Sequence, residues 1–168
     1  MHSFEPRAGD CVFIPAGTVH AIGGGLVVAE IQESSDVTYR LYDWNRTGPD
    51  GKPRPLHIEA GLEAVTRFEP VAPLRRPEGW HGDTRPLVRC EYFVFEEVRP
   101  QQTWSVGGDD GWHFLAVLEG EVQFDPAWGL PPLHKGNTVL LPAAIGRQSL
   151  TARPIAAAPA ALLHVALP

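Results

Sequence analysis

Four side chains in the first quarter of the chain carry groups that could do chemistry together: His20, Glu30, Asp36 and Arg40. A neutral imidazole can ligate a metal ion, and a partly buried carboxylate can transfer protons near neutral pH. A fixed guanidinium can stabilise an oxyanion as it develops. Whether these groups act together depends on the elements that hold them.

Each of these residues also has an ordinary structural explanation. His20 could simply line a barrel, and Arg40 could pair with a surface carboxylate. On a strand, Glu30 shares its face with Leu26 and Val28, which does not decide between a pocket and solvent. Asp36 follows two serines and could be a turn residue.

Short β-rich runs separated by turn residues recur along the whole chain. With 17 Gly and 17 Pro, the chain favours many turns and few long helices. This pattern predicts an all-β sandwich or barrel. The expected strands lie in residues 11–14, 26–33, 37–43, 87–98, 102–106, 112–124, 137–143, 147–152 and 160–167.

A helical repeat and a proline-rich stretch divide the chain. Apolar residues recur at near-helical spacing in "LHIEAGLEAVTRF", which predicts one short helix near His57 to Val65. Residues 67–86 contain several prolines and read as a linker. Gly9 and Gly136 each precede a β-rich run that ends at a proline six residues later, which suggests two related β units.

Composition excludes several classes of protein. The net charge of −6 argues against a nucleic-acid binder, and we expect no nucleic-acid partner. The sequence contains no apolar run of membrane-spanning length and no signal-peptide core, so we expect a cytoplasmic protein without a membrane partner. Cys11 and Cys90 lack metal-type spacing and are expected to be free thiols.

Two motifs resemble the cupin superfamily. The segment "GDCVFIPAGTVH" matches the second cupin motif, G-x5-P-x-G-x2-H, in which a turn reverses the chain so that His20 points into a barrel mouth. "LAVLEGEVQF" followed by "KGNTVLLPA" resembles the core of a second cupin unit. That second unit has "GGDDGWH" and "AAIGRQ" where ligand histidines would stand, so we expect it to be free of metal.

A longer run gives a more specific resemblance. "GTVHAIGGGLVVAEIQESSDVTYRLYDWNR" and "DGKPRPLHIEAGLEAV" are similar to the type I mannose-6-phosphate isomerase (phosphomannose isomerase) family in its short bacterial form. The resemblance is close over residues 9–66. It implies a zinc enzyme that interconverts mannose 6-phosphate and fructose 6-phosphate, with His20 as a metal ligand and Glu30, Asp36 and Arg40 lining the active site.

The other zinc ligands of that family, a Gln, a His and a Glu, come from an N-terminal segment that has no counterpart here. We therefore expect residues 1–66 to form the second half of a catalytic-type cupin. Residues 87–168 should form a degenerate C-terminal cupin (jelly-roll) barrel packed beside that half. Half a barrel leaves unpaired strand edges, so residues 1–46 are expected to pair with the C-terminal sheet or with a second copy in a homodimer.

The leading hypothesis is a fragment or truncated paralogue of a mannose-6-phosphate isomerase, inactive by itself because the zinc site is incomplete. The competing hypothesis is a non-catalytic module that binds a sugar phosphate or acts in assembly. A third is an independent small cupin that uses His20 with other ligands. Five further histidines show no mutual ligand spacing, and we expect His57, His81, His113, His134 and His164 to be structural or exposed.

Overall fold

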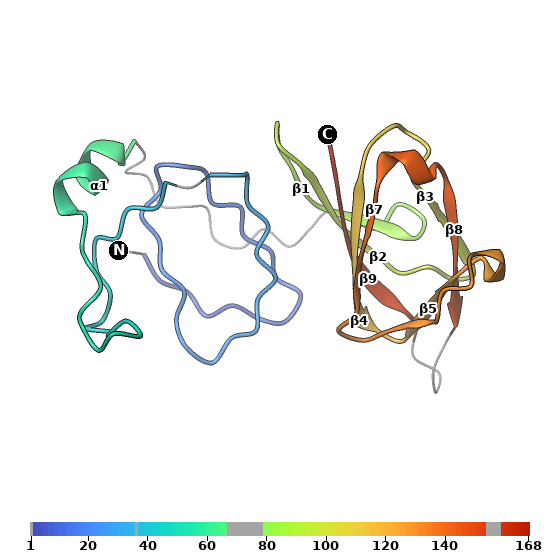
Figure 1. The fold of residues 1–168 in the computed structure, drawn as a ribbon, viewed down its shortest axis with the longest axis horizontal. Coiled ribbons are helices and arrows are strands. Elements are labelled where there is room, and N and C mark those ends of the chain that lie inside the picture. Colours follow the sequence, from blue (N-terminus) through green and yellow to red (C-terminus); the bar gives the residue numbers. More distant parts are fainter. Residues whose placement is uncertain (1, 36, 67–78, 154–158) are drawn as a thin grey trace. The chain divides into compact units, whose positions relative to one another are not determined.

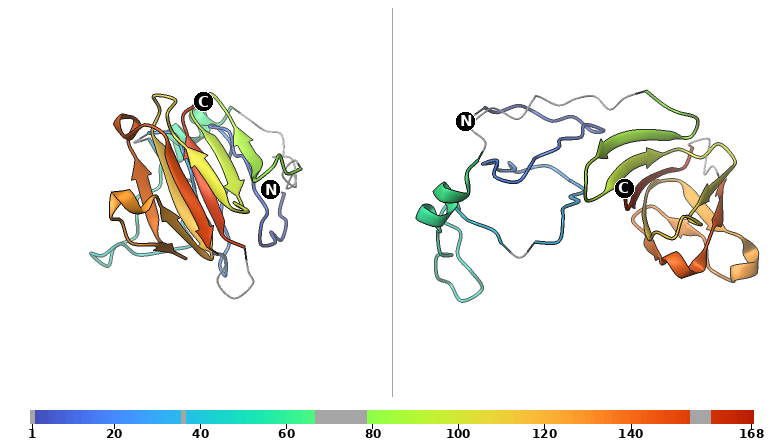
Figure 2. Two further views of the ribbon diagram at one scale, coloured as in Figure 1. Left: turned by 90° about the vertical axis from the view of Figure 1, so that its right-hand side faces the viewer. Right: turned by 90° about the horizontal axis from the view of Figure 1, so that it is seen from above.

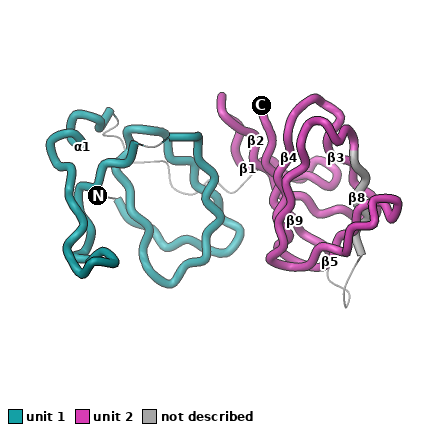
Figure 3. The backbone as a smooth tube through the Cα atoms, viewed as in Figure 1, with its two compact units in different colours: residues 1–75 teal, residues 76–168 magenta. Residues whose placement is uncertain are grey.

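The computed structural model describes residues 2–35, 37–66, 79–153 and 159–168. The chain divides into two compact units, residues 1–75 and residues 76–168 (Figure 3). The division falls inside the segment that the sequence predicts as a linker, although β1 begins within that segment, at Thr84. The limits 1–66, 67–86 and 87–168 stay a prediction.

The second unit is built from two antiparallel sheets that face each other (Figures 1 and 2). The five-stranded sheet has the order β1 (Thr84–Arg89), β2 (Val94–Val98), β9 (Ala161–Ala166), β4 (His113–Glu119) and β7 (Thr138–Leu141). The four-stranded sheet has the order β3 (Thr103–Val106), β8 (Gln148–Arg153), β5 (Glu121–Phe124) and β6 (Leu133–His134). Two short 3₁₀ helices, Pro126–Trp128 and Ala143–Ile145, lie in the connections.

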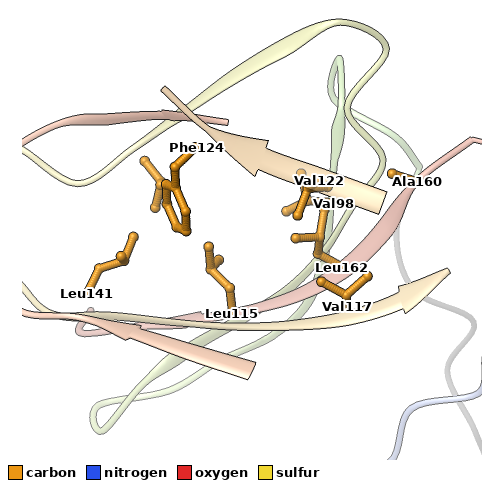
Figure 4. Close-up of a cluster of buried hydrophobic side chains, with 9 residues drawn as sticks. Val98, Leu115, Val117, Val122, Phe124, Leu141, Ala160 and Leu162 are labelled. Carbon is orange, nitrogen blue, oxygen red and sulfur yellow. The ribbon is translucent and has the colours of Figure 1, made fainter. Parts of the chain in front are cut away.

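Alternating side chains from both sheets fill the space between them (Figure 4). Along β4, His113, Leu115 and Val117 are buried, while the residues between them are partly exposed, as the two-residue period of a strand requires. Leu115 of one sheet and Val122 of the other are both completely buried. The predicted all-β cupin architecture is therefore present in this unit.

Within its described residues, the first unit contains one regular element, helix α1 (Ile58–Ala64), at the place the sequence predicts. The runs 11–14, 26–33 and 37–43 were expected to be strands, but their described residues lie outside any strand, and this expectation was wrong. A strand needs a neighbour that satisfies its backbone N–H and C=O groups. Within the described residues of this unit, no such neighbour is present beyond isolated bridges.

The two units differ in whether they contain a buried hydrophobic core. Among the described residues, every buried hydrophobic side chain lies at or after Phe93. In the first unit, large apolar side chains are widely exposed, including Val27, which is completely accessible. The segment has the apolar composition of a half-buried sheet, but the described part of this unit forms no buried hydrophobic core.

The predicted turns are present in both units. Gly17 has φ of +77°, and the Thr18 N–H donates to the Pro15 carbonyl at 3.3 Å, which closes the expected Pro-x-Gly turn. Gly9 and Gly136, the glycines of the repeat, have nearly identical φ values of +88° and +87°. Only the second of them leads into a strand, β7.

Candidate functional site

His20 follows the Pro-x-Gly turn as predicted, and its ring is oriented by the backbone. Its Nδ1 lies 2.9 Å from the Thr18 carbonyl oxygen, so Nδ1–H donates to that oxygen in the neutral ring. This hydrogen bond leaves the Nε2 lone pair free, which is the usual arrangement of a histidine that ligates a metal. The side chain itself is exposed.

Arg40 is held on several sides. Its backbone N–H donates to Nδ1 of His57 at 3.1 Å, and its carbonyl accepts from the His57 N–H at 2.8 Å. Its guanidinium donates to the Pro55 carbonyl at 3.3 Å and lies 3.8 Å from the Asp43 carboxylate. His57 is thus a partner of Arg40, which the sequence alone did not reveal because 17 residues separate the two.

Asp43 is the centre of this cluster and is almost fully buried. Arg54 donates to both of its carboxylate oxygens, from Nε at 2.6 Å and from Nη2. The hydrogen bond from Arg54, aided by the charges of Arg54, Arg40 and Arg46, holds the pKa of the Asp43 carboxyl below its ordinary value. The same bond raises the pKa of Arg54. The Asp43 carboxylate, whose charged form these contacts favour, therefore anchors the loop that also fixes Arg40.

The loop between Asp43 and Arg54 begins with a strained turn. Trp44 and Asn45 both have positive φ, +50° and +55°, and the Arg46 N–H donates to the Asp43 carbonyl at 3.0 Å, as in a type I′ turn. A bulky residue rarely takes this conformation, so the surrounding contacts must enforce it. Backbone strain of this kind is common at functional sites.

The turn displays an exposed aromatic surface. Tyr42 and Trp44 meet edge to face at 5.3 Å between ring centroids, and the Arg46 guanidinium lies over the Trp44 ring at 5.2 Å. Both aromatic side chains are more than half exposed. Aromatic faces of this kind can stack on a sugar ring or on another protein surface.

Glu30 and Asp36 contribute less to the described site. Glu30 is exposed, and within the described residues no hydrogen bond or ion pair joins it to His20 or Arg40. Asp36 lies outside the described residues. The catalytic roles of Glu30, Asp36 and Arg40 and the metal-binding role of His20 all stay predictions.

The described residues do not form a complete metal site. In ranges 2–35, 37–66, 79–153 and 159–168, no group of three or more His, Cys, Asp or Glu side chains is arranged to hold a metal ion. A structural zinc site uses four ligands and a catalytic site uses three plus water. His20 fits the role of a single ligand, and the remaining donors would have to come from elsewhere.

A second polar cluster, inside the barrel of the second unit, was missed by the sequence analysis. His113 on β4 and His164 on β9 are buried and contact each other, with a carboxylate at each end of the pair. Both histidines were expected to be structural or exposed, because the sequence shows no ligand spacing between them. Their partners lie up to 68 residues away in sequence, so only the strand register brings them together.

Comparison with known proteins agrees with this architecture. Mannose-6-phosphate isomerase ManA of Bacillus subtilis is 33% identical over 156 residues, which cover 89% of this chain and 48% of the relative. The probable mannose-6-phosphate isomerase GmuF of the same organism is 47% identical over 110 residues, 64% of this chain and 33% of the relative. No protein-family model matches the chain.

A solved structure of a mannose 6-phosphate isomerase is also similar to this chain. The mannose 6-phosphate isomerase from Bacillus subtilis superposes with a TM-score of 0.59 and 25% identity, over 79% of this chain and 40% of that one. The antiparallel double-sheet barrel and this superposition define a cupin-fold protein. More specifically, the chain is a mannose-6-phosphate isomerase-like cupin protein. It spans between a third and a half of the length of these curated relatives.

None of the helices in the described residues is long and apolar enough to cross a membrane.

Proposed function

We propose that this chain supplies one part of a mannose-6-phosphate isomerase site, which interconverts mannose 6-phosphate and fructose 6-phosphate with zinc as the metal. The observation that carries the proposal is the alignment with ManA over 89% of the chain, which includes the ordered segment that holds His20 and Arg40. The described residues offer only part of a metal site, so the remaining ligands belong to a segment that corresponds to the uncovered half of the relatives.

Arg40 has a defined role in this reaction. An aldose–ketose isomerisation moves a proton between adjacent carbons through an enediolate, and a fixed cation beside the developing oxyanion lowers the barrier. The carbonyl of Pro55 and the carboxylate of Asp43 limit where the Arg40 guanidinium can go. Because this position is set before substrate arrives, little reorganisation is needed at the moment of reaction.

His20 would provide one ligand through Nε2, and Glu30 and Asp36 would position substrate hydroxyls or exchange protons with them. A zinc ion, when bound by a complete ligand set, would polarise the sugar oxygens. A single imidazole cannot hold the ion at a fixed point, so the chain alone should isomerise mannose 6-phosphate negligibly.

The test is a chimera in which the part of Bacillus subtilis ManA not covered by this chain is joined to these 168 residues. A coupled assay should detect conversion of mannose 6-phosphate by the chimera and negligible conversion by the chain alone. In the chimera, Arg40→Ala should lower kcat by about 10²–10³-fold, the usual effect of removing a donor to an oxyanion. Arg89→Ala, which removes an exposed arginine at the end of β1, should leave kcat unchanged.

A folded, zinc-loaded chimera without isomerase activity would contradict the proposal. If that chimera still bound mannose 6-phosphate, the competing function, a non-catalytic sugar-phosphate-binding or assembly module, would replace it. Robust turnover by the 168-residue chain alone would show instead that the chain holds a complete site.

A further inference from the structure

A chain of four polar side chains crosses the five-stranded sheet inside the barrel of the second unit. Asp109 Oδ1 lies 2.9 Å from Nε2 of His113, and Nδ1 of His113 lies 2.9 Å from Nε2 of His164. Nδ1 of His164 then lies 3.0 Å from Glu96 Oε2. The proposed isomerase site in the first unit uses none of these residues.

The strand register places the four residues together. Glu96 on β2 stands directly opposite His164 on β9, and His164 stands opposite Leu115 on β4. His113, two residues before Leu115, shares the inward face of β4. Leu115 belongs to the barrel core, so the histidine pair continues that core as a polar layer.

The geometry of the two rings is that of a hydrogen bond. Their planes differ by only 13° and their centroids are 5.2 Å apart, although two of their nitrogens are 2.9 Å apart. Rings stacked face to face would have much closer centroids. The rings therefore meet edge to edge in nearly one plane, which aims an N–H of one at the lone pair of the other.

The hydrogen bonds among these four side chains require three ring protons on the two histidines. Each ionised carboxylate accepts an N–H, so Nε2 of His113 and Nδ1 of His164 must both carry a proton. The contact between the rings needs one more proton, on either of the two facing nitrogens. Two neutral imidazoles supply only two protons, and three are required.

The alternative with two neutral rings is unfavourable. It would leave two lone pairs facing each other at 2.9 Å, on residues that are only 4% and 7% exposed. A buried polar atom without a partner costs about 1–3 kcal/mol. Nor do the carboxylates hold the third proton, because a carboxyl group normally gives up its proton at lower pH than an imidazole.

We propose that the His113–His164 pair is a proton-binding site, which holds one proton more than two neutral histidines and shares it between the rings. Asp109 and Glu96 balance this positive charge, so the four groups together carry a net charge of −1. The ligand of this site is a proton, and the exposed carboxylate of Asp109 gives it access to solvent.

The groups around the histidine pair are compatible with one additional positive charge on it. Two neutral groups from other elements lie beside the pair, in addition to the two carboxylates. The Trp104 ring of β3 meets His164 edge to face at 5.3 Å, and Leu141 of β7 stands opposite His113. The Arg147 side chain lies beside Gly108, in the loop before Asp109. The hydrogen bond from His113 lowers the pKa of Asp109, which keeps that end of the chain ionised.

The test counts ring protons by NMR on the full chain labelled with ¹⁵N-histidine, at about pH 7.5. The four ring nitrogens of His113 and His164 should carry three protons in total. One lies on each nitrogen that faces a carboxylate, and the third is shared between the two nitrogens that face each other. Two protonated and two unprotonated nitrogens, which is the state of two neutral rings, would overturn the proposal.

Asp109→Asn provides a matched test that removes the need for the third proton. The asparagine amide can donate to Nε2 of His113, so all contacts are then satisfied by two neutral rings. The variant should therefore show two protonated nitrogens. Asp110→Asn, which changes the neighbouring exposed acid, should retain three. An unchanged count in Asp109→Asn would overturn the proposal.

Denaturant unfolding gives a second readout. Above about pH 7, histidines of an unfolded chain are mostly neutral, so unfolding releases the shared proton. The stability of the native chain should therefore fall as pH rises from 7 to 9, with the unfolding constant increasing up to about tenfold per pH unit from this site. Asp109→Asn should lack this component. Equal slopes for the two proteins would contradict the proposal.

Discussion

Arg54 donates to both carboxylate oxygens of Asp43, which ties the two ends of the 43–54 loop together. The carboxylate that receives these bonds is nearly buried, and Arg40 lies beside it. This bidentate pair is the structural link between the strained turn at Trp44 and the arginine that the isomerase proposal uses. Bidentate arginine–carboxylate pairs combine strength with a fixed geometry.

Asp43→Asn should loosen this loop. The amide cannot accept from both Arg54 nitrogens as an ionised carboxylate does, and it leaves Arg40 without its nearby negative charge. The bond after Arg46 is a trypsin site within the loop, whereas the bonds after Lys52 and Arg54 precede prolines. We expect cleavage after Arg46 to become several-fold faster, as measured by mass spectrometry over time. Glu63→Gln, in helix α1, should leave the rate unchanged, and equal rates in all three proteins would contradict this view.

Features that depend on neighbouring residues can be predicted from the sequence, whereas features that depend on distant contacts cannot. The turns at Gly17 and Gly136, helix α1 and most of the barrel strands follow local patterns, and they were predicted. The expected run 87–98 overlaps two strands, β1 and β2, and β6 was not expected. The strands expected before residue 44 depend on neighbours from elsewhere. Periodicity predicts that a segment could be a strand, but it cannot supply the backbone partner that the ladder needs.

The candidate functional residues also divide into those found from a local motif and those whose partners are distant in sequence. His20 follows from a local motif, while the partners of Arg40 and of His113 are determined by tertiary contacts over 17 and 51 residues. No spacing rule within a strand indicates that His113 and His164 meet. Strand pairing places them together, so the polar layer became visible only from the register of β4 and β9.

The stability of the second unit should depend on Asp109 at acid pH. The hydrogen bond from His113, together with the Gly111 N–H, lowers the pKa of the Asp109 carboxyl in the folded state. Its contribution is therefore fully present above its unfolded pKa of about 3.9 and is lost as pH falls through the lower folded value. The difference in Tm between the native chain and Asp109→Asn should shrink below about pH 4. Asp110→Asn should match the native chain throughout, and a constant difference down to pH 3 would contradict this assignment.

Gly120 is a packing constraint at the turn between β4 and β5. It has φ of +71°, and a Cβ there would lie 2.8 Å from the Ala160 Cα. Gly120→Ala should destabilise the second unit by about 1–3 kcal/mol, because it adds a backbone clash to the strain of a positive φ. Gly129 has a similar φ of +62° but open space around it, so Gly129→Ala isolates the strain alone. Denaturant unfolding should show the larger loss for Gly120→Ala, and equal losses would rule out the clash.

The chain alone should self-associate through residues 1–46. The apolar side chains of this segment are exposed in the described residues, and a surface of this kind normally meets a partner. Sedimentation velocity should show a concentration-dependent dimer that Val27→Lys weakens. Leu140→Lys, at an exposed apolar position of β7, should leave the association unchanged. A monomer at all concentrations would remove the homodimer from consideration.

We propose that His20 contributes one ligand to a zinc site whose other ligands lie outside this chain. Elemental analysis of the dialysed ManA chimera measures that zinc. We expect about one tightly bound zinc per chimera, substoichiometric zinc in the 168-residue chain, and loss of the metal in the His20→Ala chimera with the fold retained by circular dichroism. Stoichiometric zinc in the isolated chain, or full retention of zinc in the His20→Ala chimera, would contradict the account.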